Sequence, residues 1–188
     1  MNIFAVDEDP EIAAQSLHDV HVNKMLVESC QLLATAHPDG SSPYAHTHYN
    51  HPCAVWVRAS NANYMWLACH ALALSAERSA RWPQRAEHAS TTAAIWYATN
   101  VPTLPSCGLT RFAIAVPTEL RCDDPITSYR AYYVMHKLRM KRGTVRWTLR
   151  RPPEWIYDCL LGSNSDMCIA YDNGRYEVTP QRSGVTAT

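Results

Sequence analysis

Long stretches without glycine or proline, separated by prolines, constrain the fold of this chain more than any other feature. Residues 11–36 contain neither residue and are rich in alanine, leucine and methionine, which favour helix. The segment forms one helix or two consecutive ones. Similar stretches, 52–81, 84–100 and 125–141, predict further helices, with Pro83 and Gly143 ending two of them.

Two short motifs predict where helices begin. Asp9 precedes Pro10, and Asp124 precedes Pro125, so each pair offers a capping carboxylate followed by a proline suited to the first helical turn. The apolar residues 2–6 form a short extended segment. A chain of 188 residues fits one domain. We therefore expect an all-α, single-domain, bundle-like enzyme, with a catalytic domain over 1–162 and a partly flexible C-terminal extension over 163–188.

Composition limits the cellular setting. Apolar residues make up 47% of the chain, yet no apolar run approaches the roughly 18 residues that span a bilayer, so no membrane partner is expected. The first residues are acidic, unlike a secretory or mitochondrial signal. The seven cysteines include no CxxC pair, and an odd number argues against a secreted disulfide framework. These features predict a cytoplasmic protein with reduced thiols.

The predicted first helix carries a polar stripe on an otherwise apolar segment. His21, Lys24, Glu28 and Gln31 are spaced three, four and three residues apart, which places them on one side of a helix. Valine, leucine and methionine occupy much of the remaining surface, so the stripe is expected to line a cleft or a buried polar network. Glu28 or His21 is the candidate proton acceptor, and Lys24 the candidate anion contact.

Two other groups of polar residues have open interpretations. Asn63 and His70 lie on one line of the second predicted helix and face either a neighbouring helix or a ligand. The histidine-rich loop 46–51 does not match a zinc pattern, and no metal or cofactor is expected. His51 directly precedes the predicted helix start at Pro52, which favours a phosphate or substrate contact.

A basic segment contrasts with the zero formal charge of the chain. Seventeen cationic and seventeen anionic side chains balance, but residues 137–151 hold seven cations and no acid. This segment forms either a solvated face or a contact for a polyphosphate backbone. The expected DNA-binding residues are Arg139, Lys141, Arg142, Arg146, Trp147, Arg150 and Arg151.

Several of these motifs resemble a known family. The sequence is similar to phage amino acid:DNA transferases, the second clade of α-glutamyl/putrescinyl-thymine pyrophosphorylases. The resemblance covers roughly residues 2–157, and its densest part is the DxHxxKMxxExxQLL pattern of residues 19–33. It is carried by the runs IFAVDEDPEIAAQSLHDVHVNKMLVESCQLL, NHPCAVWVRASNANYMWL, FAIAVP, DDPITSYRAYYVMHK and RWTLRRPPEW.

The resemblance implies an all-α enzyme that acts on phosphorylated 5-hydroxymethyluracil in DNA within the host cytoplasm. The amine of a small molecule such as free glycine would displace the phosphate and give Nα-glycinylthymidine. Such a reaction needs cations for the leaving group, a base for the amine and a pocket that excludes water. The expected substrate- and phosphate-binding residues are Asp19, Gln31, Asn50, His51, Arg58, Asn63, Arg130 and Lys137.

Alternative chemistry and alternative functions stay open at this point. Displacement is either direct or proceeds through a nucleophile at C6 of the base, for which Cys30 and Cys53 are candidates. The target nucleotide is either flipped out or approached in the major groove. The rival functions are a base-excising DNA glycosylase and a non-enzymatic module that binds DNA or metal.

Overall fold

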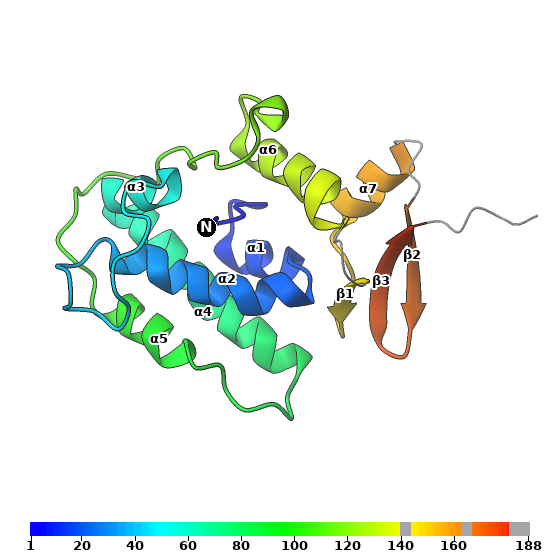
Figure 1. The fold of residues 1–188 in the computed structure, drawn as a ribbon, viewed down its shortest axis with the longest axis horizontal. Coiled ribbons are helices and arrows are strands. Elements are labelled where there is room, and N and C mark those ends of the chain that lie inside the picture. Colours follow the sequence, from blue (N-terminus) through cyan, green and yellow to red (C-terminus); the bar gives the residue numbers. More distant parts are fainter. Residues whose placement is uncertain (140–143, 163–166, 181–188) are drawn as a thin grey trace, which may run out of the picture.

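The fold consists of helices with a small sheet at one side, as the computed structural model shows (Figure 1). It describes residues 1–139, 144–162 and 167–180. The helical elements are α1 (Pro10–Ser16), α2 (Asp19–Ala34), α3 (Pro52–Ala59), α4 (Asn61–Arg81), α5 (Thr91–Thr99), η1 (Thr118–Leu120), α6 (Pro125–Tyr132), η2 (Tyr133–Lys137) and α7 (Glu154–Gly162). The strands are β1 (Val145–Thr148), β2 (Met167–Asp172) and β3 (Arg175–Pro180).

The predicted capping motifs are confirmed. The Asp9 carboxylate accepts the backbone N–H groups of Glu11 and Ile12, and Pro10 is the first residue of α1. Asp124 caps α6 in the same way. A carboxylate here satisfies amide donors that have no partner inside the helix.

Three of the predicted helical stretches are interrupted or change type. The first stretch divides at Leu17, whose extended backbone ends α1 before α2 begins. The stretch 52–81 divides at Ser60, which is also extended and whose hydroxyl accepts the Asn63 N–H to cap α4. The helix predicted over 125–141 changes at Tyr133 into the π-helical turn η2. Apolar composition marks all these segments as helical but does not fix the breaks.

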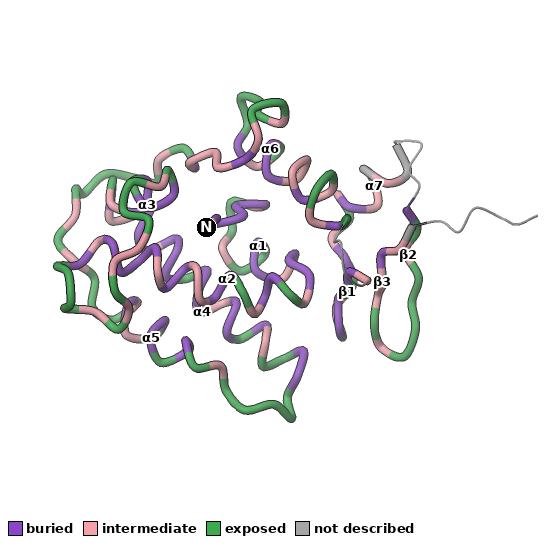
Figure 2. The backbone as a smooth tube through the Cα atoms, in the orientation of Figure 1, coloured by how far each residue is buried: buried purple, intermediate pink, exposed green. Residues whose placement is uncertain are grey.

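The core lies between α2 and α4, which pack against each other at the centre of the molecule, with α1, α3 and α5 around them (Figure 1). The N-terminal residues 2–6 are buried on α2, as the tube in Figure 2 shows. Large side chains that are fully buried include Tyr64, Tyr97, Tyr129 and Trp147.

The all-α prediction is wrong, because the chain also forms a three-stranded antiparallel sheet in the order β1-β3-β2. β2 and β3 form a hairpin, and β3 pairs with β1 so that Trp147 lies opposite Tyr176. The residues between the hairpin strands, Asn173 and Gly174, both have positive φ. This is the backbone of a type I′ turn, for which Asn-Gly is a favoured sequence. The hairpin joins residues 167–180 to the same sheet as β1.

Candidate functional site

Within the polar stripe of α2, His21 and Glu28 face the N-terminal segment, whereas Lys24 is exposed to water. His21 is 8% exposed, and its ring stacks on Phe4 with a centroid distance of 4.8 Å. Lys137, at the end of η2, lies near the same ring, with its Nζ 5.8 Å from the Phe4 centroid and 4.5 Å from that of Tyr132. We refer to Phe4, His21, Lys24, Glu28 and Lys137 as the His21 site.

Tyr133 fixes the protonation of His21. Its hydroxyl accepts the backbone N–H of His18 at 2.9 Å and contacts His21 Nδ1 at 3.0 Å. Donation of the hydroxyl proton to Nδ1 would give that proton a partner and leave the imidazole proton on Nε2, and this is the tautomer we expect. Burial, followed by the charges of Lys137 and Lys24, lowers the pKa of His21 to about 3, so the ring is neutral at physiological pH.

Lys24 and Glu28 form an ion pair one helical turn apart. Lys24 Nζ lies 3.2 Å from Glu28 Oε1, and the lysine side chain is 63% exposed whereas that of Glu28 is 13% exposed. Glu28 Oε2 accepts the backbone N–H of Asn2 at 2.9 Å. The carboxylate therefore anchors the N-terminal segment while it keeps a cation at the surface edge of the site. His51 lies within electrostatic range of Glu28.

Backbone conformation at the site is unusual in two places. Phe4 has a φ of 40°, which is rare for an aromatic residue and stores about 1–3 kcal/mol of strain. The Asn2 side chain holds it there by accepting the N–H groups of Ile3 and Phe4. The π-helical turn η2 carries Lys137, and such turns are frequent at functional sites. Both irregularities orient groups that surround His21.

Arg130 and Asp19 are engaged in contacts within the protein. Arg130 donates to the Val6 carbonyl at 2.8 Å and to the Asp7 carboxylate at 3.3 Å, so it holds the N-terminal segment. Asp19 accepts the N–H and hydroxyl of Thr148 and pairs with Arg81 at 3.0 Å. Both oxygens of this carboxylate thus have partners in the protein, and Asp19 joins α2 to β1 and α4.

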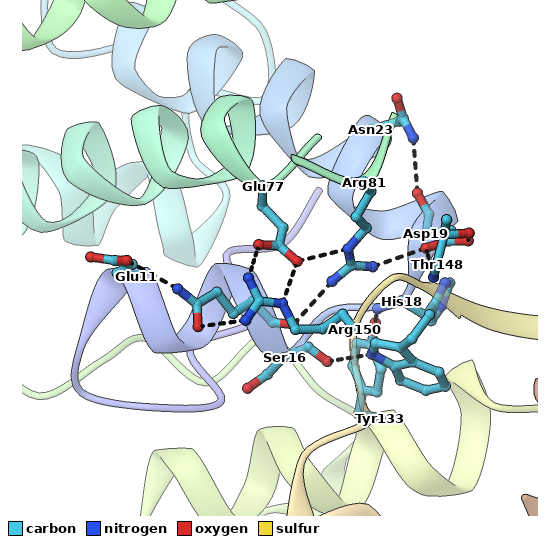
Figure 3. A network of polar contacts seen from close by, with 12 residues as sticks. Glu11, Ser16, His18, Asp19, Asn23, Glu77, Arg81, Tyr133, Thr148 and Arg150 are labelled. Carbon is cyan, nitrogen blue, oxygen red and sulfur yellow. Dashed lines mark hydrogen bonds and ion pairs between the residues drawn. The ribbon is translucent and has the colours of Figure 1, made fainter. Parts of the chain in front are cut away.

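A buried network extends from Asp19 to α4 and to the segment after β1 (Figure 3). Glu77 accepts Arg81 Nε at 2.7 Å and both Nε and Nη2 of Arg150, at 2.8 and 2.6 Å. Arg81 and Glu77 are almost completely buried, with side chains 1% and 3% exposed. This network joins α2, α4 and the sheet. The sequence did not indicate this grouping of Glu77 with two arginines.

Asn63 is structural as well. It is fully buried, donates to the Trp56 carbonyl and the Thr110 hydroxyl, and accepts the Thr110 N–H. Its assignment as a ligand contact is therefore corrected, since every polar atom of its amide has a partner in the protein. The Asn63 amide holds the segment around Thr110 against α3 and α4.

The remaining predicted phosphate contacts lie around α3 and the far end of α2. His51 caps α3 by accepting the Cys53 N–H at 3.2 Å. Arg58 donates to the Tyr49 carbonyl and lies 3.6 Å above the Tyr49 ring. Asn50 is exposed and Gln31 is half-buried. Of this group, His51 is the residue for which an electrostatic interaction with Glu28 ties it to the His21 site.

The basic segment does not form one continuous face. Trp147 is fully buried and its indole N–H donates to the Ser16 carbonyl, so its predicted contact with DNA is corrected to a core position. Arg150 belongs to the Glu77 network, and Arg146 pairs with Glu177 on β3. Arg139 and Arg151 are exposed, and Arg151 stacks over Tyr157. Lys141 and Arg142 lie outside the described residues.

The thiols proposed for attack at C6 are buried. Cys30 and Cys53 have no exposed surface, and desolvation raises their pKa values to about 12 and about 11. A thiol with such a pKa is protonated at neutral pH and is a poor nucleophile. Neither thiol is therefore suited to act as the nucleophile expected at C6. In the described part of the chain, no group of three or more metal-ligating side chains is assembled.

A further hollow lies elsewhere, between α1 and α4. Its volume is about 650 Å³, and Leu72, Ala73 and Ala76 form an apolar floor with Glu77 and Arg150 at one end.

The sequence also missed Tyr133 and Phe4. The role of Tyr133 depends on its hydrogen bond to His21, which lies 112 positions away in the sequence. The role of Phe4 depends on ring stacking with His21, seventeen positions away.

Of the helices within the described residues, none is both long and apolar enough to cross a bilayer. Searches against protein-family models, curated proteins and solved structures returned no match.

Proposed function

We propose that this protein is a DNA-modifying transferase that replaces the phosphate of 5-phosphomethyl-deoxyuridine in DNA with the amine of an amino acid, most simply glycine. The observation that carries the proposal is the grouping of a neutral imidazole, two lysines and a carboxylate at the His21 site. The resemblance of residues 2–157 to amino acid:DNA transferases supplies the reaction, and the geometry supplies candidate groups for each step.

The reaction exchanges one bond for another at the exocyclic methylene. The amine nitrogen forms a C–N bond, the C–O bond breaks, and inorganic phosphate leaves with the electron pair. The attacking amine must be deprotonated, and the leaving phosphate must be stabilised as its negative charge rises. Lys24 and Lys137 supply positive charge on two sides of His21, which suits the phosphate.

The local chemistry divides the roles of His21 and Glu28. A neutral His21 with its proton on Nε2 acts as a hydrogen-bond donor to the phosphate rather than as a base. Glu28 is the remaining candidate proton acceptor. Its carboxylate contacts Lys24 and the Asn2 N–H, so its position is fixed on a rigid helix.

The test is mass spectrometry of nucleosides after incubation of the protein with phosphomethyluracil DNA and glycine. Wild type is expected to produce Nα-glycinylthymidine. Glu28→Gln and Lys137→Gln are expected to lose at least about a hundredfold in turnover, a typical contribution of a positioned proton acceptor or charge-stabilising group. Glu87→Gln, a change of the same kind at an exposed position, is the matched control.

The outcomes separate this proposal from its rivals. Release of a free base with an abasic site would identify a glycosylase. Tight DNA binding with no change in nucleoside mass for any amine tested would indicate a non-enzymatic module. Full activity in folded Glu28→Gln would show that another group takes the proton.

A further inference from the structure

A second cationic surface borders the start of α2, and its members come from distant parts of the sequence. A hollow of about 300 Å³ is lined by Arg85 from the segment after α4, Arg146 from β1 and Arg175 from β3. Trp82 and Thr148 contribute to the same wall. We refer to this hollow as the arginine groove. Of its three arginines, Arg85 and Arg175 fall outside the basic segment 137–151.

The sheet explains why two of these arginines meet. Arg146 and Thr148 lie two residues apart on β1, so their side chains project from one face. Arg175 is the register partner of Thr148, and Glu177 is that of Arg146. The opposite face carries Val145, Trp147 and Val178, which are buried in the core. The alternation of side chains along the strands therefore places Arg146 and Arg175 on the face opposite the core, where both line the hollow beside α2.

The acidic groups near the groove do not cancel its charge. Asp19 lies in the wall of the groove, but its carboxylate Oδ1 pairs with Arg81 Nη1 at 3.0 Å. Glu177 pairs with Arg146, whose side chain is 46% exposed, and such a surface pair is weak and exchangeable. Asp172 is the register partner of Arg175. Within the described residues, neither Arg85 nor Arg175 forms an ion pair.

The groove and the His21 site share one exposed face of α2. Val20 lines the groove and is 48% exposed, and Lys24 follows one helical turn later with its side chain 63% exposed. Residues four apart lie side by side on a helix. A strand that leaves the groove along this face therefore reaches Lys24, at the edge of the His21 site.

We propose that the arginine groove binds the phosphodiester backbone of DNA through Arg85, Arg146 and Arg175, and directs the strand along α2. Three guanidinium groups on separate elements suit successive phosphates, which guanidinium binds with two hydrogen bonds each. Because the chain has no net charge, it can attract a polyanion only where cations gather apart from acidic groups. The inference rests on the proposed function only for the choice of DNA as the polymer.

The experiment measures binding of unmodified DNA, so its result does not depend on catalysis. Fluorescence anisotropy with a labelled duplex follows affinity between about 50 and 200 mM salt, where each phosphate contact contributes about 0.9 to the slope of log K against log salt. The double variant Arg85→Gln/Arg175→Gln is expected to lower the magnitude of this slope by about 1.8, the sum for two contacts. Both side chains are exposed, so the fold is expected to persist.

The matched control is Arg111→Gln/Arg121→Gln, which removes two exposed arginines near η1. It is expected to leave the slope near that of wild type. An equal reduction in both double variants, or none in either, would overturn the groove assignment. Binding confined to RNA of the same sequence, or to anionic lipid vesicles, would overturn DNA as the partner. Wild-type protein that binds DNA normally but forms no product would count against the transferase proposal alone.

Discussion

The buried network around Glu77 provides a sharp test of what holds the helices and the sheet together. The substitution Glu77→Gln preserves size and one carbonyl oxygen but removes the negative charge. In the native protein the Glu77 carboxylate contacts Arg81 Nε at 2.7 Å and Arg150 Nη2 at 2.6 Å. After the substitution, Arg81 keeps Asp19 and the Gln15 carbonyl, both at 3.0 Å.

The expected loss follows from which cation is left without its partner. The Arg81 side chain is 1% exposed, so water cannot replace the carboxylate, whereas that of Arg150 is 36% exposed and can be hydrated. Removing one partner from a buried ion pair costs about 3–5 kcal/mol. Because Arg81 retains Asp19, we expect a loss of about 3 kcal/mol, at the lower end of that range. For a chain of this size the melting temperature would fall by about 6–12 °C.

The assay is urea unfolding followed by tryptophan fluorescence, with thermal unfolding by circular dichroism as a second measurement. Arg150→Gln is expected to cost about 1 kcal/mol because its side chain reaches solvent. Glu87→Gln, at an exposed position, is the control for loss of a carboxylate. A loss in Glu77→Gln no larger than in Glu87→Gln would refute the reasoning that the buried charge pairing stabilises this junction.

Three further predictions concern the groups near the proposed chemistry. Tyr133→Phe removes the donor to His21 Nδ1 and the acceptor for the His18 N–H, so we expect a loss of about 1–3 kcal/mol. Long-range proton–nitrogen NMR should then show a changed His21 tautomer, and an unchanged spectrum contradicts the assignment. Burial lowers the pKa of His21 to about 3 and that of His70 to about 4, from 6.5. Because the unfolded chain binds more protons below pH 6.5, the free energy of unfolding should be constant above that pH and fall as pH decreases toward 4. Urea unfolding at neutral and acidic pH checks this, and stability that rises on acidification contradicts it. Cys53→Ala should retain turnover within a few-fold of wild type, and its complete loss, in folded protein, would restore the C6 route.

Local sequence signals were most informative at helix ends and on α2. Asp9 and Asp124 cap their helices as predicted, because a capping carboxylate acts on amides two or three residues away. The expected orientation of His21 and Glu28 away from bulk solvent is also confirmed by their exposures, 8% for the His21 residue and 13% for the Glu28 side chain, whereas Lys24 is exposed. The sheet was missed although Asn173-Gly174 is a recognised hairpin signal.

The amino-acid sequence by itself determined what depends on neighbours within a few residues: helix-forming stretches, their caps, and the side of α2 on which polar groups gather. Only the tertiary structure decided which of those groups meet partners from elsewhere. The Tyr133 hydroxyl reaches His21 across 112 positions, and Arg150 reaches Glu77 across 73. Likewise Arg85, Arg146 and Arg175 line one hollow because strand pairing and helix packing bring them together. Contacts between distant segments depend on how the whole core packs, and no local periodicity encodes that arrangement.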